Sequence, residues 1–451
     1  MPSSPGLYPL VCAWLQALPA PRSLHPAALR ALAHLVTALL IGQSLRPSAL
    51  MRALPSPLPV PARQRYKRVA RAWTRPWLSP AWLTPRLVTA ALALVSPDPA
   101  DRPTAGLTHL ALDSVHCGRW DLFTVGVVWH GRVLPVSRAV LPSPWPKRQF
   151  TPTVCALVRQ VVAAWPAQRP AHRVADRGFP SRPLFRLLDQ AGWGWTLRLR
   201  ATSWVRIAGQ AHWVRPLLTE GVAQGWTTYA ATQYATGPGE PLGTLVVGRG
   251  LPVLPRHQCG PASLRIRADQ YGRRQAHVAH KHPHQRPDTS RQTDRWMVLF
   301  TSHTTWLAAV TSYGRRWAAE GTYRDAQTGW DGQHGWDLTT TVARLTDAAM
   351  VERVVGLWAL GALIQTWIGH CLGQPGAALP VPLIRREWTT TGRLSVWARG
   401  QLALTEPTGR LRPWLRHVLT LGARRVARGP RLIRSPAPQL THLPVAPPIA
   451  A

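Results

Sequence analysis

The spacing of hydrophobic residues divides the chain into segments of different types. Residues 25–54 carry apolar side chains at helical spacing, with interruptions at Gly42 and Pro47. From about residue 105 the apolar runs become short and rich in β-branched residues. Helical spacing returns later, over residues 313–330, 345–372 and about 409–427. The pattern predicts a helical region, then a mixed α/β layer, then a second helical region.

The segment from 105 to 200 alternates predicted strands and helices. Strands are predicted in "LTHLALDSV", in both halves of "DLFTVGVVWHGRVLPVSRAVL", in "HRVAD" and in "WGWTLRLR". Helices are predicted in "TPTVCALVRQVVAAW" and in "SRPLFRLLDQAG", where Ser181 is the candidate N-cap and Gly192 the stop. Three strands, a helix, a strand, a helix and a strand, in that order, predict one mixed α/β layer.

Residues 201–294 differ from the segments on either side of them. They are rich in Gly and Trp and contain short alternating runs, which predict a β-rich insertion. The strand pattern resumes in "RWMVLFTS" at 295–302. Four histidines near the end of the insertion lack neighbouring cysteines and zinc-finger spacing, so we expect no zinc site there. They are His277, His280, His282 and His284.

The charge balance favours a polyanionic partner. The chain of 451 residues has 54 Lys and Arg against 19 Asp and Glu, a formal net charge of +35. Nearly all of the positive charge is arginine, which binds phosphate with two parallel hydrogen bonds and stacks on bases. A GC-rich genome also enriches arginine, together with Ala, Pro and Gly, and we expect both causes to act.

The positive charge is least balanced near the N-terminus. The first 97 residues contain ten Arg, one Lys and no acidic residue, and residues 63–75 interleave basic residues with Tyr66 and Trp73. This pattern predicts a helical DNA-binding domain over residues 1–100. The alternative is a solvated basic helix face; the lack of balancing carboxylates favours phosphate contact.

Cysteine usage and hydropathy indicate a cytoplasmic protein. The five cysteines are scattered and odd in number, which argues against a disulfide scaffold. No signal peptide is predicted, because the N-terminus lacks a positive region before its apolar stretch. Residues 354–372 are barely long enough to span a bilayer and contain Gln365 and His370, so we expect a buried helix within a helical region over 345–430. The Pro-rich tail, 431–451, is predicted to be disordered.

Three carboxylates occupy informative positions in a chain that has few. Asp113 and Asp176 each lie at the end of an apolar strand. Glu320 lies in a predicted helix, among cations and aromatic residues. On a regular helix at about 100° per residue, one narrow stripe collects Tyr313, Arg316, Glu320, Arg324 and Gln327. Taken alone, such a stripe is also compatible with ordinary surface ion pairs.

Three stretches together resemble the DDE transposases of bacterial insertion sequences, most closely insertion-sequence family four. They are "ALDSV", "VADRGFPSRPLFRLLDQAGWGWTLRLR" and "YGRRWAAEGTYRDAQTGW". The family signature runs Tyr, two residues, Arg, three residues, Glu, six residues, Lys. Tyr313, Arg316 and Glu320 match it, whereas Gln327 stands where the family has lysine. The resemblance covers residues 105–200 and 295–335 well and is weak elsewhere.

The resemblance implies a fold and a metal site. The fold is an RNase H-like catalytic core, made of residues 105–200 and 295–344 and interrupted by the β-rich insertion at 201–294. The site is a pair of Mg²⁺ ions, which Mn²⁺ would replace, held by the three carboxylates. Asp113 would bridge the ions, and Asp176 and Glu320 would each complete one shell. The implied reactions are cleavage at the transposon ends and strand transfer into target DNA.

The resemblance also assigns DNA contacts. Tyr313 and Arg316 would contact phosphates near the cut end. At Gln327 three alternatives stay open: weaker end binding, replacement of the missing charge by Arg324, or a decayed copy. Trp296 resembles a tryptophan that stacks on a flipped base, although a tryptophan within a strand is more often part of a core.

Three functions compete at this point. The first is a cut-and-paste transposase that acts as a homodimer on double-stranded DNA with terminal inverted repeats, in the bacterial cytoplasm near the nucleoid. The second is a catalytically inactive, transposase-derived DNA-binding protein, which the departure at Gln327 favours. The third is another RNase H-like nuclease such as a junction resolvase, which the insertion and the Tyr–Arg–Glu series disfavour.

Overall fold

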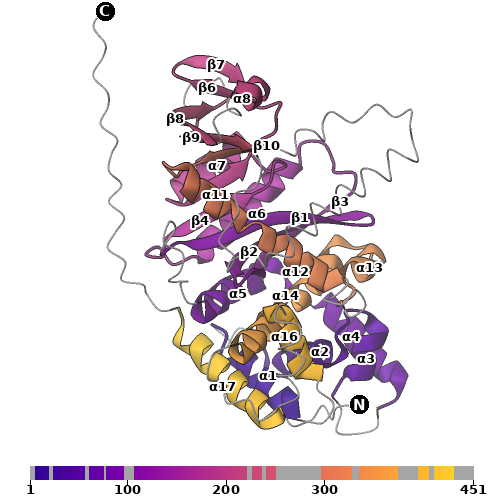
Figure 1. Ribbon diagram of the computed structural model, residues 1–451. Coiled ribbons are helices and arrows are strands. Elements are labelled where there is room, and N and C mark those ends of the chain that lie inside the picture. Colours follow the sequence, from indigo (N-terminus) through magenta and orange to yellow (C-terminus); the bar gives the residue numbers. More distant parts are fainter. Residues whose placement is uncertain are drawn as a thin grey trace, which may run out of the picture.

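An α/β architecture with one ten-stranded mixed sheet organises the protein (Figure 1). The strand order is β3-β2-β1-β4-β5-β10-β9-β8-β6-β7. The four histidines of the insertion and the tail at 431–451 lie outside the described residues. The computed structural model describes residues 6–19, 24–55, 60–75, 78–95, 106–220, 226–235, 240–249, 296–327, 335–373, 395–405 and 411–430.

The first five strands are the ones that the sequence pattern predicts. β1, β2 and β3 form an antiparallel meander, and β4 and β5 add to the other side of β1 in parallel. His130 and Gly131 make the tight turn between β2 and β3, both at positive φ. This confirms the mixed sheet. The strands are β1 (Thr108–Cys117), β2 (Trp120–Trp129), β3 (Arg132–Pro142), β4 (Ala171–Ala175) and β5 (Gly194–Arg198).

The β-rich segment continues the same sheet. β10 pairs antiparallel with β5, and β9, β8, β6 and β7 follow it in that order toward the sheet edge, each antiparallel to its neighbour. Figure 1 shows β6 and β7 at the far end of the sheet from the helical region. The limits of this segment as a domain, 201 and 294, stay predictions. The strands are β6 (Trp204–Ile207), β7 (Gln210–Trp213), β8 (Trp226–Tyr234), β9 (Leu242–Arg249) and β10 (Trp296–Thr301).

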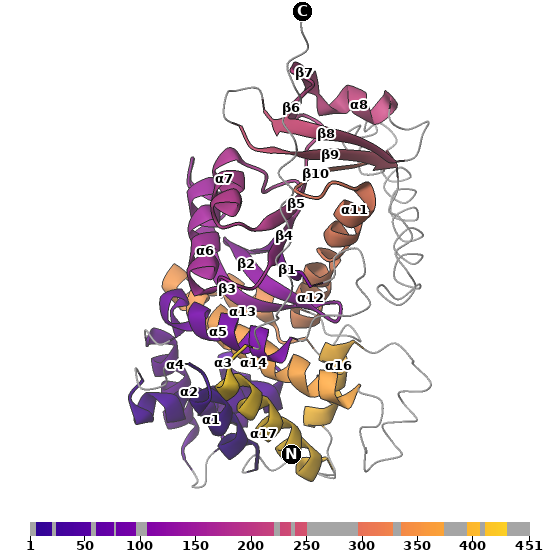
Figure 2. The ribbon, with the colours of Figure 1, turned by 90° about the vertical axis from the view of Figure 1, so that its left-hand side faces the viewer.

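Helices flank both faces of the first five strands. α6 (Phe150–Ala164) and α7 (Arg182–Gln190) cover one face, and α11 (Trp306–Gly314) and α12 (Trp317–Gln327) cover the other (Figure 2). α8 (Val214–Glu220) lies on the extension. The helices predicted at 151–165 and 181–192 are therefore present.

Helices from both ends of the chain pack together in one region below the sheet (Figure 1). α2 ends at Gly42 and α3 begins at Pro47, as the sequence predicts. The helices are α1 (Leu7–Gln16), α2 (Pro26–Gly42), α3 (Pro47–Ala53), α4 (Ala62–Thr74), α5 (Pro80–Leu94), α13 (Leu338–Ala343), α14 (Ala348–Leu372), α16 (Val396–Thr405) and α17 (Arg412–Arg428).

α14 is the predicted buried helix at the centre of this region. It contacts α2, α5, α16, α17 and the edge strand β3. Among the described helices it alone is long and apolar enough to cross a membrane by itself, but 89% of its most apolar window is buried inside the protein. Its apolar surface is therefore already covered by the fold.

Candidate active site

The register of two parallel strands brings Asp113 and Asp176 together. β1 and β4 pair from Thr108 with Ala171 up to Leu112 with Ala175. Asp113 is the next residue of β1, which continues to Cys117, and Asp176 is the first residue after β4. The two carboxylates therefore lie side by side, because neighbouring strands are about 4.8 Å apart. Strand alternation points both toward the face that α11 and α12 cover.

α12 brings Glu320 to the same point. Ala318 and Ala319 pack on Ala111 and Val174, which lie two residues before the aspartates on the same face of the sheet. These small side chains allow the helix to lie close to the strands. The Thr322 hydroxyl accepts a 2.7 Å hydrogen bond from the backbone N–H of Val133 and fixes the helix along β3.

The helix predicted over 313–330 is broken, and that prediction is wrong over its first turn. α11 ends at Gly314 and α12 begins at Trp317. Tyr313 and Arg316 therefore do not lie on one exposed helix face with Glu320, as a continuous helix would place them. Their side chains are 1% and 4% exposed. Residues 328–330 lie outside the described residues.

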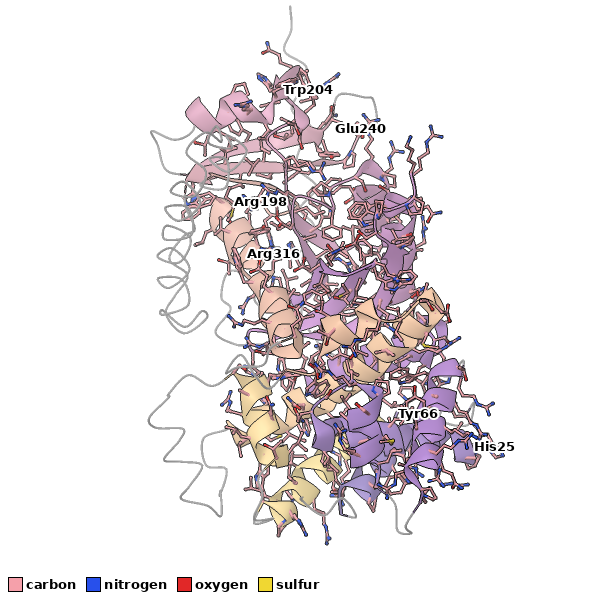
Figure 3. The ribbon with its side chains drawn as sticks, turned by 90° about the vertical axis from the view of Figure 1, so that its right-hand side faces the viewer. His25, Tyr66, Arg198, Trp204, Glu240 and Arg316 are labelled. Carbon is pink, nitrogen blue, oxygen red and sulfur yellow. The ribbon has the colours of Figure 1, made fainter. Side chains whose placement is uncertain are left out.

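The break places the guanidinium of Arg316 among the three carboxylates. Its Nη2 donates a 2.7 Å hydrogen bond to Glu320 Oε1. Its Nη1 lies 3.7 Å from Asp113 Oδ2 and 3.9 Å from Asp176 Oδ2, which is ion-pair range but too long for a hydrogen bond. The guanidinium also lies 4.7 Å from the centre of the Trp317 ring. Figure 3 labels Arg316 beside the α11–α12 junction.

Asp113 is the carboxylate with the most strongly perturbed titration. Burial raises its pKa to about 6, against the opposing effects of Arg316 and of the Ser114 backbone N–H. The negative charges of Glu320 and Asp176 raise it further. A carboxyl whose pKa is shifted by burial and by neighbouring charges in a cleft is typical of a functional site.

Asp176 has the opposite shift. Burial acts to raise its pKa, but Arg316, the backbone N–H of Arg177, and Arg198 outweigh burial and lower it. The buried hydroxyl of Tyr313 adds a 3.1 Å hydrogen bond to Asp176 Oδ1. Arg198 Nη1 lies 3.8 Å from the same oxygen. Asp176 is therefore ionised wherever Asp113 titrates.

Arg316 is a permanent cation in this setting. Burial acts to lower its pKa, but Tyr313, Asp176, Glu320 and Asp113 together raise it above its ordinary value. Its Nε is buried and has no hydrogen-bond partner. A buried charge of this kind is retained only where opposite charges surround it.

The donor set fits hard divalent cations. Three carboxylates supply the oxygen ligands that Mg²⁺ and Mn²⁺ prefer. In the described residues, however, no three His, Cys, Asp or Glu side chains are placed to hold a metal by themselves. The carboxylates converge on a guanidinium, and metal ligation would require Arg316 to move.

A basic groove opens directly from the two aspartates. Its volume is about 710 Å³, and Asp113 and Asp176 are among its lining residues. Gly178, Thr202 and Arg215 of α8 line it as well. Four arginines line it, which are Arg177, Arg198, Arg200 and Arg215. None of these four arginines is among the contact residues predicted from the sequence.

The remaining predicted contact residues lie on α12 and β10. Arg324 is exposed one turn after Glu320, and Gln327 is the half-buried last residue of α12. Trp296 is the first residue of β10, opposite Arg249 of β9. The DNA contacts assigned to Tyr313, Arg316, Arg324, Gln327 and Trp296 stay predictions.

A second basic groove lies in the N-terminal helices. Its volume is about 1200 Å³, and its lining includes Ala28, Leu35 and Trp82. Arginines from α2 and α4 line it, and Tyr66 of α4 is 51% exposed nearby on the same helix. Figure 3 labels Tyr66 and His25 at the opposite end of the molecule from Trp204. The lining arginines are Arg30, Arg65, Arg68, Arg71 and Arg75.

No protein-family model matches the chain, and the search of curated proteins found no match either.

Proposed function

We propose that the protein is a metal-dependent DNA transposase of the DDE type. The observation that carries this proposal is the convergence of Asp113, Asp176 and Glu320 on one cation, beside an arginine-lined groove that the two aspartates also line. The sheet supports it as well: a parallel β1–β4–β5 unit extended by antiparallel β2 and β3 is the arrangement expected of an RNase H-like core.

The carboxylates would hold the metal, and the arginines would hold the substrate. Asp113, Asp176 and Glu320 are the ligand candidates for Mg²⁺ or Mn²⁺. When bound, the divalent cation supplies charge neutralisation at the attacking and leaving oxygens of a phosphodiester. Arg198 and Arg200 line the route along which a DNA backbone reaches the aspartates. Arginine suits this task because its planar group binds two phosphate oxygens at once.

The N-terminal helices would hold DNA at a second place. Arg65, Arg68 and Arg71 line one groove, and no acidic side chain occurs in the first 97 residues to compete for them. Two separated basic grooves suit a duplex that is gripped away from its cleaved end. We expect a homodimer on DNA with terminal inverted repeats, acting in the bacterial cytoplasm.

A catalytically inactive DNA-binding protein is the second candidate. Two observations favour it: Gln327 replaces the family lysine, and Arg316 lies where a metal would be held. Arg324 is exposed one turn after Glu320. In the transposase proposal it supplies the charge that Gln327 lacks. A third class, the junction resolvases, has no observation here that favours it.

Cleavage assays with the full chain separate these candidates. The substrate is DNA carrying the sequences that flank the gene, with Mg²⁺ or Mn²⁺. We expect nicking at a terminal repeat followed by strand transfer, and loss of both in Asp113→Ala, Asp176→Ala and Glu320→Ala with DNA binding retained. Asp189→Asn, on the opposite face in α7, is the matched control and should cleave normally. Binding without metal-dependent cleavage in the unaltered protein would establish the second candidate.

A further inference from the structure

Arg316 occupies the point on which the three proposed metal ligands converge. We propose that Arg316 is a resident counter-ion which a divalent cation must displace, and that a DNA phosphate receives the displaced guanidinium. Metal loading and DNA binding would then be coupled through one side chain. The inference rests on the proposed function and adds an order to it: the site loads fully only when DNA is present.

The contacts of Arg316 explain why it and a metal exclude each other. Its Nη2 already donates a hydrogen bond to Glu320 Oε1, and its Nη1 lies 3.7 Å from Asp113 Oδ2 and 3.9 Å from Asp176 Oδ2. A magnesium ion takes its ligands at about 2.0–2.1 Å, so it would need the space and the lone pairs that the guanidinium now faces. Two cations side by side in a poorly solvated site also repel each other strongly.

The same contacts leave the hydrogen bonding of Arg316 incomplete, so the guanidinium can gain hydrogen bonds from a new acceptor. Of the three carboxylates, Arg316 donates a hydrogen bond to Glu320 only, and its contacts with Asp113 and Asp176 are longer ion pairs. Its buried Nε has no hydrogen-bond partner among the described residues. The residue precedes α12, so a change of its side chain leaves the helical hydrogen bonds of α12 in place. It is therefore attached at a junction and not in the middle of a helix.

A displaced arginine needs a new anion, and the groove is where one would arrive. Arg198 lies in that groove with its Nη1 3.8 Å from Asp176 Oδ1, which places the groove and the carboxylates in direct contact. Phosphate accepts arginine in a two-pronged, charge-assisted geometry. By linkage, DNA must raise metal affinity by the same factor by which metal raises DNA affinity.

The first test measures Mn²⁺ binding to the full chain without DNA, by electron paramagnetic resonance of free Mn²⁺. We expect weak binding in the unaltered protein and at least about tenfold tighter binding in Arg316→Gln, because the neutral amide frees the carboxylates. Arg198→Gln is the matched control, since it removes a cation equally near Asp176 but outside the cluster. It should tighten Mn²⁺ binding clearly less than Arg316→Gln does.

The second test repeats the titration with a duplex of the flanking DNA, after subtraction of the Mn²⁺ that the duplex binds alone. DNA should tighten Mn²⁺ binding to the unaltered protein, and the gain should shrink in Arg316→Gln. The thermal midpoint of each variant in chelator checks folding, and its rise with Mn²⁺ gives a second measure of affinity. Arg344→Gln, an exposed position after α13, is the control for loss of charge in general.

The outcomes separate the two proposals. If the unaltered protein and Arg316→Gln bind Mn²⁺ equally well, Arg316 is no counter-ion to the metal and only this inference fails. If neither binds Mn²⁺, with or without DNA, the carboxylates are not a metal site and the proposed function fails with it. Equal tightening by Arg198→Gln and Arg316→Gln would also overturn the inference, because general charge would then explain the effect.

Discussion

At the scale of single residues, the neighbouring Asp113 and Asp176 have pKa shifts of opposite sign. The raised pKa of Asp113, about 6 against an ordinary 3.8, means that its charged form is disfavoured in the folded protein. Between those two values the unfolded state loses its proton first, so the folded protein loses stability as pH rises through this window. A difference of this size corresponds to roughly 3 kcal/mol above pH 6.

Asp113→Asn should therefore stabilise the protein at neutral pH. We expect a gain in the free energy of unfolding of about 2–3 kcal/mol at pH 7.5 that vanishes at pH 4, measured by urea unfolding in chelator. Asp176→Asn is the contrasting variant, because the lowered pKa of Asp176 means that its charge is stabilised by the fold. It should destabilise at neutral pH. The same sign for both variants would contradict the electrostatics described here.

The hydroxyl of Tyr313 offers a second test at this scale. It donates to Asp176 Oδ1 from a side chain that is 1% exposed. Tyr313→Phe should cost about 1–3 kcal/mol at neutral pH, because a hydrogen bond to a charged group is removed. The cost should fall as Asp176 becomes protonated below pH 4. Tyr323→Phe removes a neutral hydrogen bond with Thr124 and should give a loss independent of pH; matching pH profiles for the two variants would be the contrary result.

At the scale of elements, strand patterns carried more information than helix periodicity. Asp113 and Asp176 could be paired from the sequence because each follows an apolar strand run, and parallel strands align such runs side by side. The expectation that Asp113 ends its strand is wrong, because β1 continues through Asp113 to Cys117 as the partner of β2; only β4 stops before its aspartate. The break between α11 and α12 could not be predicted in this way. Residues 313–327 keep helical spacing through it, and Gly314 is the one local signal of an end.

The position of α12 was likewise beyond the sequence, because it depends on contacts with a distant strand. The Thr322 hydroxyl accepts a hydrogen bond from the Val133 N–H and donates one to the Ala318 carbonyl oxygen. It thereby joins α12 to β3, a strand 189 residues away along the chain. The continuation of the sheet through β10 into β9 is a long-range pairing of the same kind. Local propensity does not encode which edge a strand joins.

Thr322→Val tests whether this anchor positions Glu320. The variant keeps the shape of the side chain but leaves the buried Val133 N–H without its partner, which should cost about 1–3 kcal/mol in unfolding free energy. Because the anchor lies two residues from Glu320, Mn²⁺ affinity should fall as well. Thr340→Val, at an exposed threonine of α13, is the matched control and should change neither quantity. Lower stability with unchanged Mn²⁺ affinity would show that α12 holds its place by apolar packing alone.

At the scale of the whole molecule, part of the net charge of +35 lies in two arginine-lined grooves. Arginines gather in the groove beside the carboxylates and in the groove of the N-terminal helices. Figure 3 shows Arg198, next to Arg316, far from the N-terminal helices that carry Tyr66 and His25. A composition bias from the genome alone would place arginine without regard to the carboxylates. Arginines beside the acidic cluster are what the proposed binding of DNA at this site requires.

The salt dependence of DNA binding tests the proposed DNA path directly. Removing one arginine that neutralises a phosphate lowers the slope of log binding constant against log salt by about 0.9. Arg200 and Arg215 are exposed lining residues of the groove, so the double variant Arg200→Ala, Arg215→Ala should lower the slope by about 2 and weaken binding of duplex DNA. Arg424→Ala, on α17, which packs against α1 and α5 in the helical region, should leave the slope unchanged. An unchanged slope in the double variant, together with normal folding, would mean that duplex DNA reaches the carboxylates by a route other than this groove.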